Sequence, residues 1–153
     1  MRTMREILFR AKHYRTKQWV YGIPFKNPLR GSKDAYYSQI IPEVHGVHST
    51  INSCSIIEET IGQFTGLTDK NGVKIFEGDI VKGTAYSGKF VGVIVWIDEI
   101  GGFGVRYRKR QEATAWENSS ILKCASKGRT DEFTAEVIGN IYDNPELIGG
   151  EEQ

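Results

Sequence analysis

The sequence predicts a mainly β protein made of short antiparallel strands, with little helix. β-branched and aromatic residues alternate with polar residues along much of the chain, as expected for half-buried strands. Gly, Asn and Asp recur at short intervals between these runs, and helix start and stop signals are sparse. We expect an N-terminal β unit over residues 1–60 and a C-terminal unit over 61–153 that contains a small barrel.

The N-terminal unit is expected to hold several strands and to be irregular at its prolines. Pro24 and Pro28 predict a break in regular structure, because proline lacks the backbone N–H that a strand ladder uses. A loop through 27–33 should follow. The expected strands are 7–9 and 18–22, which form a hairpin with its turn at 12–17, and then 35–41 and 47–57.

The middle of the chain contains the most specific local pattern, a hairpin around Asn71 and Gly72. Residues 63–67 and 73–76 on either side have the β propensity to pair. Asn-Gly supplies the positive φ angles that a tight β-turn requires. The sequence therefore predicts a hairpin with a fixed register here.

A second series of strands is expected after this hairpin. Gly78 and Asp79 predict a turn into a strand, which a Gly-rich break at 83–88 should end. Strands at 90–97 and 103–107 follow, joined by a glycine turn, and the second has one apolar and one basic face. A Gly-Asp-x-Val opening before short, glycine-containing strands is typical of SH3-like barrels.

The end of the chain predicts one more strand and a short helix. Residues 136–141 alternate as a strand. Pro145 suits the first position of a helix with Asn144 as its cap, although few residues remain. The sequence thus predicts one or two helical turns, followed by a tail at 149–153 that should fray.

Composition points to a reduced, intracellular environment. Cys54 and Cys124 lie far apart and lack the close spacing of a metal ribbon, a redox centre or a disulfide framework. The first residues lack the apolar run of a signal peptide, and no stretch approaches the ~20 apolar residues of a membrane span. We expect a cytoplasmic protein without a membrane segment.

Charge is segregated along the chain although the net charge is +1. Residues 1–33 contain nine Lys or Arg and one Glu, whereas residues 131–153 contain seven Asp or Glu and no Lys or Arg. This asymmetry favours a polyanionic partner or head-to-tail self-assembly. The alternatives are that the two ends face each other within one folded chain, or that both are solvated surfaces.

Three segments of the chain resemble the YopX protein family. They are residues 59–81, which contain the Asn71–Gly72 hairpin, residues 136–147, and residues 7–11 with Trp19 downstream. The resemblance implies a phage or prophage protein of Gram-positive bacteria, mainly β, with an SH3-like barrel and no assigned biochemical activity. It therefore supplies no catalytic, metal-binding or cofactor-binding residues.

Catalytic and metal sites are not predicted from the residues themselves. His45 and His48 with Cys54 lack a fourth ligand, and residues three apart in a strand point to opposite faces. The acidic pairs at 77 and 79 and at 98 and 99 lie beside turns, where carboxylates serve solvation and capping. The glycines at 101–104 do not open a helix, so they do not form a dinucleotide site. We expect a protein without enzymatic activity, cofactor or small-molecule substrate.

Two binding functions remain, and the sequence leaves both open. The favoured one is a protein-interaction or assembly module that forms a homo-oligomer, since three Trp and seven Tyr provide interface anchors. The alternative is nucleic-acid binding, in which cations neutralise phosphates and aromatic rings stack on bases. The candidate residues for the alternative are Arg10, Lys12, Arg15, Lys17, Trp19, Arg106, Tyr107, Arg108, Lys109 and Arg110.

Overall fold

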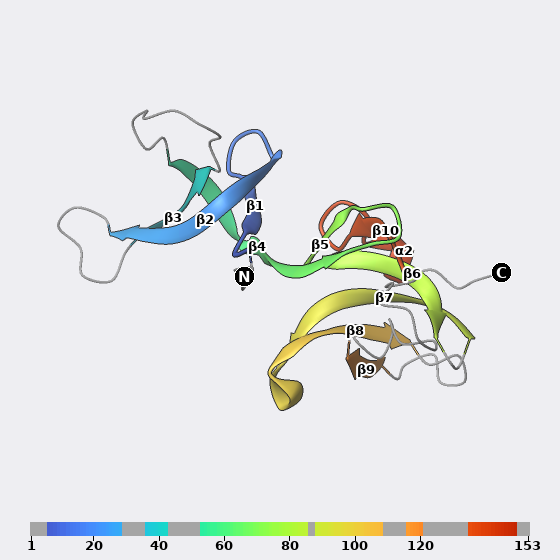
Figure 1. Ribbon diagram of the computed structural model, residues 1–153. Coiled ribbons are helices and arrows are strands. Elements are labelled where there is room, and N and C mark those ends of the chain that lie inside the picture. Colours follow the sequence, from blue (N-terminus) through green and yellow to red (C-terminus); the bar gives the residue numbers. More distant parts are fainter. Residues whose placement is uncertain are drawn as a thin grey trace. The chain divides into compact units, whose positions relative to one another are not determined.

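The chain forms two compact units, Met1–Phe64 and Thr65–Gln153. A computed structural model describes residues 6–28, 36–42, 53–85, 88–108, 116–120 and 135–149 (Figure 1). The division between the units falls inside one long strand, β4, which spans Cys54–Thr68. That the chain has two domains with a boundary at 60/61, as expected from the sequence, remains a prediction.

The first unit is a small closed barrel of four strands. Its other strands are β1 (Phe9–His13), β2 (Trp19–Pro28) and β3 (Tyr36–Pro42). The antiparallel pairs β1–β2, β2–β3 and β3–β4 are joined by a fourth pair, β1–β4, which closes the ring. Its core contains Ala11, Ile40 and Ile56, with Val20, Cys54 and Ile61 packed against them.

The prediction that Pro24 and Pro28 interrupt regular structure was wrong, because β2 continues through both residues. Pro24 lies opposite Ile40 of β3. The register between β1 and β2, in contrast, extends no further along β2 than Gly22. Beyond Gly22, one edge of β2 is thus without a β1 partner, and proline is tolerated at such an edge because its missing N–H leaves no ladder bond unmade. The predicted strand ending at Pro42 was correct.

The turn between β1 and β2 projects polar and aromatic side chains into solvent. It is held by the backbone N–H of His13, which donates to Gln18 O at 2.9 Å, and by that of Lys17, which donates to His13 O at 3.0 Å. The His13 Nδ1 accepts the backbone N–H of Thr16 at 3.2 Å. Lys17 adopts a positive φ of 59°. These bonds fix the position of the exposed residues Tyr14 and Arg15.

The second unit begins with the predicted hairpin, formed by the end of β4 and by β5 (Lys74–Phe76). Positive φ angles were expected at both Asn71 and Gly72, but the turn has one only at Gly72. Gly72 has a φ of 80°, whereas the φ of Asn71 is not positive. The Asp69 carboxylate instead organises a longer turn, since its Oδ1 accepts the backbone N–H groups of Asn71 at 2.8 Å and Val73 at 2.9 Å. The turn thus depends on the Asp69 carboxylate as well as on the positive φ of Gly72.

An antiparallel series of strands builds the remainder of the second unit. The sheet order is β10-β6-β7-β8-β9, and Figure 1 shows that β6, β7 and β8 curve along their lengths. The core contains Ile75, Val81, Phe90, Ile94, Val105 and Ala135. The elements are β6 (Asp79–Ala85), β7 (Gly88–Ile97), η1 (Asp98–Ile100), β8 (Gly102–Arg108), β9 (Trp116–Ser120), β10 (Glu136–Asn140) and α2 (Glu146–Gly149).

The expected Gly-rich break at 83–88 was wrong in part, because Gly83 lies within β6 opposite Phe90. A side chain at Gly83 would place its Cβ 2.9 Å from Cζ of Phe90. The glycine is therefore needed for close packing of an aromatic ring rather than for chain flexibility. β9 was not expected at all, because 116–120 reads as a polar stretch in sequence.

The described strands place the closed ring in the first unit rather than in the second, where the sequence predicted a barrel. Among the residues that the structure describes, no strand pairing closes the sheet β10-β6-β7-β8-β9 of the second unit into a ring.

No helix in the described part of the chain is long and apolar enough to cross a membrane.

Candidate interaction surfaces

The N-terminal basic residues lie on the outer face of β1 and β2 and in the turn that joins them. Ala11 and Val20 point to the barrel core, so their neighbours Arg10, Lys12 and Trp19 project outward by strand alternation. Arg10 Cζ lies 4.4 Å from the centre of the Trp19 ring, and Lys12 Nζ lies 5.3 Å from it. Three of the candidate nucleic-acid residues thus form one cation–π cluster.

Arg10 is buried in this cluster and is only 8% exposed. Its register partner on β4 is Gly62, which carries no side chain, so the guanidinium can lie against the sheet and reach Trp19. A guanidinium covered in this way presents little surface to a phosphate. The Arg10–Trp19 contact therefore serves the barrel more directly than it serves a ligand.

The turn residues form the solvent-exposed part of the same segment. Arg15 and Lys17 are exposed, and Lys17 Nζ lies 5.2 Å from the ring of Tyr14. These two cations and the half-buried Lys12 are the N-terminal candidates with accessible charge.

The second basic segment lies on β8 in the other unit. Arg106 is exposed and is opposite Val93 of β7. Tyr107 and Arg108 belong to the same strand, but their side chains lie outside the description, as do Lys109 and Arg110 entirely. A common groove formed by both basic segments remains a prediction, since the segments belong to different units.

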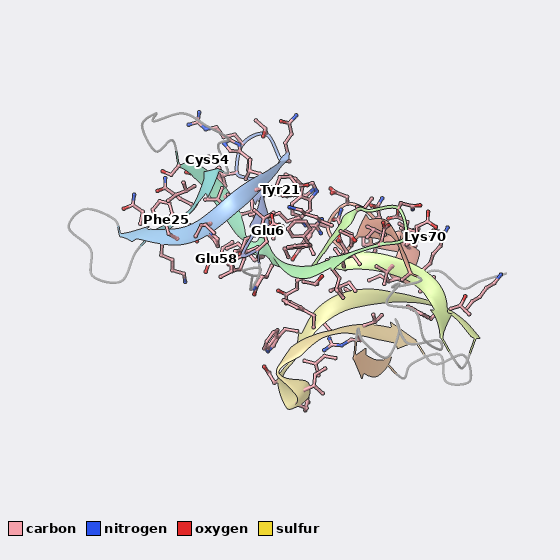
Figure 2. All side chains as sticks on the ribbon, viewed as in Figure 1. Glu6, Tyr21, Phe25, Cys54, Glu58 and Lys70 are labelled. Carbon is pink, nitrogen blue, oxygen red and sulfur yellow. The ribbon has the colours of Figure 1, made fainter. Side chains whose placement is uncertain are left out.

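An exposed apolar stripe on β2 was missed in the sequence. Tyr21 is 42% exposed and Ile23 is 48% exposed, and both lie on the same face as Trp19 by alternation. Figure 2 labels Tyr21 and Phe25, which both belong to β2. The signal was present in the sequence as apolar residues on both faces of 19–23, but the assumed break at Pro24 hid it.

A second exposed apolar group lies at the hairpin tip between β7 and β8. Trp96 is 46% exposed and Ile100 is 52% exposed. The Trp96 ring packs edge-on against Phe103, with centroids 5.2 Å apart and planes at 83°. Its Nε1 donates to Asp98 Oδ1 at 2.9 Å. At this tip the position of the Trp96 ring is thus fixed by its contacts, and the exposed carboxylates of Asp98 and Glu99 lie beside it.

The buried carboxylates have structural partners. Asp79 is 1% exposed, and its Oδ2 accepts the backbone N–H of Phe76 at 2.7 Å across the turn before β6. Asp69 is 6% exposed and also accepts the backbone N–H of Val137 at 3.1 Å. Burial acts to raise the pKa of Asp69, but the N–H donors of its turn and of β10, with the nearby Lys70 charge, outweigh it, and the pKa lies below its usual value.

One residue of the acidic C-terminal segment is paired within its own unit. Glu136 Oε2 lies 2.8 Å from Lys70 Nζ and 3.6 Å from Lys82 Nζ. The hydrogen bond from Lys70 is the main cause that lowers the pKa of Glu136. Lys70, labelled in Figure 2, thus ties the turn after β4 to β10.

No group of three or more His, Cys, Asp or Glu side chains that could hold a metal ion occurs among the described residues. His45 and His48 lie outside them. Cys54 has a free thiol whose Sγ lies 3.8 Å from Ile40 O, and burial raises its pKa.

Fold and surfaces together define a two-unit, mainly antiparallel β protein with a closed four-stranded barrel in its first unit. The chain belongs to the YopX protein family, whose sequence profile matches residues 8–149. Among solved structures, it is similar to protein EF1440 from Enterococcus faecalis, with 30% sequence identity and a TM-score of 0.48. That match covers 94% of this chain and 98% of the other. No curated protein matches the chain.

Proposed function

We propose that this protein is a non-enzymatic assembly module that acts by binding to further copies of itself. The observation that carries the proposal is the apolar stripe on β2, where Tyr21 and Ile23 stay exposed on a strand of a closed barrel. Exposed apolar side chains held together on a rigid strand are a common feature of interaction sites.

The residue types of the exposed positions support a protein partner. Tyr and Trp are enriched among the side chains that dominate interface energies, and both occur here at Tyr21 and Trp96.

Light scattering during size-exclusion chromatography tests the proposal. We expect a defined oligomer at micromolar protein concentration, with a mass that changes little between low and moderate salt, because salt screens interactions between charges and does not screen apolar contacts. A monomeric mass at every concentration would overturn the proposal.

A second candidate function, binding of a nucleic acid, is favoured by the exposed cations Arg15 and Lys17 beside Tyr14. It predicts that affinity for single-stranded DNA falls steeply as salt rises. Fluorescence anisotropy with labelled DNA would measure this. Replacing Arg15 and Lys17 with Ala should weaken binding, as should replacing Arg106, Arg108 and Arg110, whereas Lys89→Ala on exposed β7 surface serves as the control.

We also propose that the second unit is an SH3-like small barrel. Support comes from the curved antiparallel strands β6, β7 and β8 and from β10, which returns to pair with β6 (Figure 1). Nuclear Overhauser contacts that close the ring between strands of this unit would establish it; an open sheet in solution would exclude it.

The family resemblance adds a phage or prophage origin and a cytoplasmic site of action in a bacterial host to this proposal. Fractionation of cells that express the protein should recover it in the cytoplasmic fraction. Recovery with membranes or in the medium would contradict this part.

A further inference from the structure

We infer that two surfaces of the chain bind each other between copies: the outer face of β2 on one copy and the β7–β8 hairpin tip on the next. The inference rests on the proposed self-association and identifies the surfaces that carry it. The contact is heterologous, because each copy presents one surface of each kind.

The first surface, here named the cationic β2 face, consists of Lys12, Arg15, Lys17, Trp19, Tyr21 and Ile23. The exposed side chains of Tyr21 and Ile23 give it an apolar centre. Trp19 is held from one side by Arg10, at 4.4 Å, so it adds a fixed ring beside them. The exposed cations of the β1–β2 turn lie at one end of this stripe.

The second surface, here named the anionic tip, consists of Trp96, Asp98, Glu99 and Ile100. Like the first surface it combines exposed apolar side chains with charged ones, but its charges are negative. Trp96 and Ile100 are about half exposed and provide the apolar part, and the two carboxylates stand between them in the short η1 helix. The hydrogen bond from Trp96 to Asp98 and the packing on Phe103 hold the indole in place.

Charge complementarity identifies a second copy as the occupant. An apolar stripe with cations at one end and an apolar tip that carries two carboxylates occur on the same polypeptide, so each copy supplies the partner that the other surface needs. The apolar side chains provide most of the affinity, and the opposite charges set orientation and speed association. A heterologous contact of this kind produces a ring where the rotation closes and an open chain where it does not.

Two single substitutions test the two surfaces separately. Ile23→Glu places a negative charge where the anionic tip would dock, and Ile100→Asn removes the apolar side chain from the tip. Each should weaken association by roughly tenfold or more, since full burial of an Ile side chain corresponds to about that change. Val73→Asn is the matched control, because Val73 is 48% exposed in the second unit and lies outside both surfaces. Circular dichroism shows whether each variant is folded.

Mixing the two defective variants gives the sharper result. The Ile23→Glu copy keeps an intact tip and the Ile100→Asn copy keeps an intact β2 face, so a heterologous contact predicts a one-to-one dimer that neither variant forms alone. Analytical ultracentrifugation would detect it.

The other outcomes separate the inference from the proposed function. An oligomer whose mass is unchanged by both substitutions would overturn this inference and leave self-association standing. Loss of association with Ile23→Glu alone, without rescue on mixing, would indicate a β2-to-β2 contact and also overturn it. A wild-type protein that stays monomeric would overturn the inference together with the proposed function. This holds whether the cationic β2 face contacts the anionic tip of the same copy or the monomer binds DNA.

Discussion

The carboxylate of Asp69 accepts the backbone N–H of Val137 at 3.1 Å, across 68 residues of sequence. The same side chain organises the turn after β4 through two further backbone N–H groups. Nearby, the backbone N–H of Lys70 donates to Ala135 O at 3.3 Å. These hydrogen bonds from a short turn thus connect the start of the second unit to β10 and the residue before it.

Asp69→Asn is expected to destabilise the second unit by about 2 kcal/mol. The amide has one acceptor oxygen in place of two, and hydrogen bonds to a charged acceptor contribute ~1.5–3 kcal/mol. Amide hydrogen exchange at core residues of each unit would measure the two stabilities separately. Glu146→Gln, at an exposed carboxylate of the same unit that lies outside both proposed surfaces, is the control. Equal protection in both variants would show that the Asp69 contacts contribute little.

Acid is expected to loosen the second unit through the same carboxylate. The pKa of Asp69 is lower in the folded protein than its usual value of 3.8, so ionised Asp69 stabilises the fold above that value. This stabilisation is lost as pH falls below 3.8 and through the lower folded pKa. Glu136 contributes in the same direction, but it is paired near the surface and is screened by salt.

Urea unfolding from pH 6 down to acid would reveal this dependence. In the Asp69→Asn variant the slope of stability against pH should be shallower than in the wild type. An unchanged slope would assign the acid sensitivity to other carboxylates.

Gly139→Ala is expected to destabilise the end of the chain by about 1–3 kcal/mol, the usual cost of overpacking. A Cβ at this position would lie 2.6 Å from Asn144 Oδ1, which accepts the backbone N–H of Asn140 at 3.4 Å. Thermal unfolding would measure the loss. Gly102→Ala is the control, because a Cβ there meets one atom, at 4.0 Å. A Gly139→Ala variant as stable as that control would show that Asn144 moves at little cost.

Arg10 and Trp19 are expected to be coupled in stability by about 0.5–2 kcal/mol, the range for cation–π pairs from exposed to desolvated sites. A double-mutant cycle with Arg10→Met and Trp19→Leu, read by hydrogen exchange in the first unit, isolates this term. Additive effects of the two substitutions would mean that the 4.4 Å contact carries no interaction energy.

The strands were predictable where the sequence carries local turn chemistry, and less so where tertiary contacts decide. The hairpin at Gly72, the strand that ends at Pro42 and the strand at 136–140 follow from period-two alternation and turn residues. Pro24 was misinterpreted because its effect depends on which strand lies beside it, and that information is absent from local sequence.

The candidate surfaces were predictable only in part, because exposure depends on the fold. The basic and aromatic types at 10–19 are visible in sequence, but burial of Arg10 against Trp19 depends on the strand pairing that brings Gly62 beside it. Trp96 falls within the predicted strand 90–97, and only the structure shows that it is half exposed beside Asp98.

The molar mass of the wild type and of Ile23→Glu, compared by light scattering over a range of protein concentrations, tests whether copies associate through the cationic β2 face. We expect a wild-type oligomer that dissociates in the folded Ile23→Glu variant and persists in the Val73→Asn control. A wild type that is monomeric throughout, or an Ile23→Glu variant that keeps the wild-type mass, would contradict it.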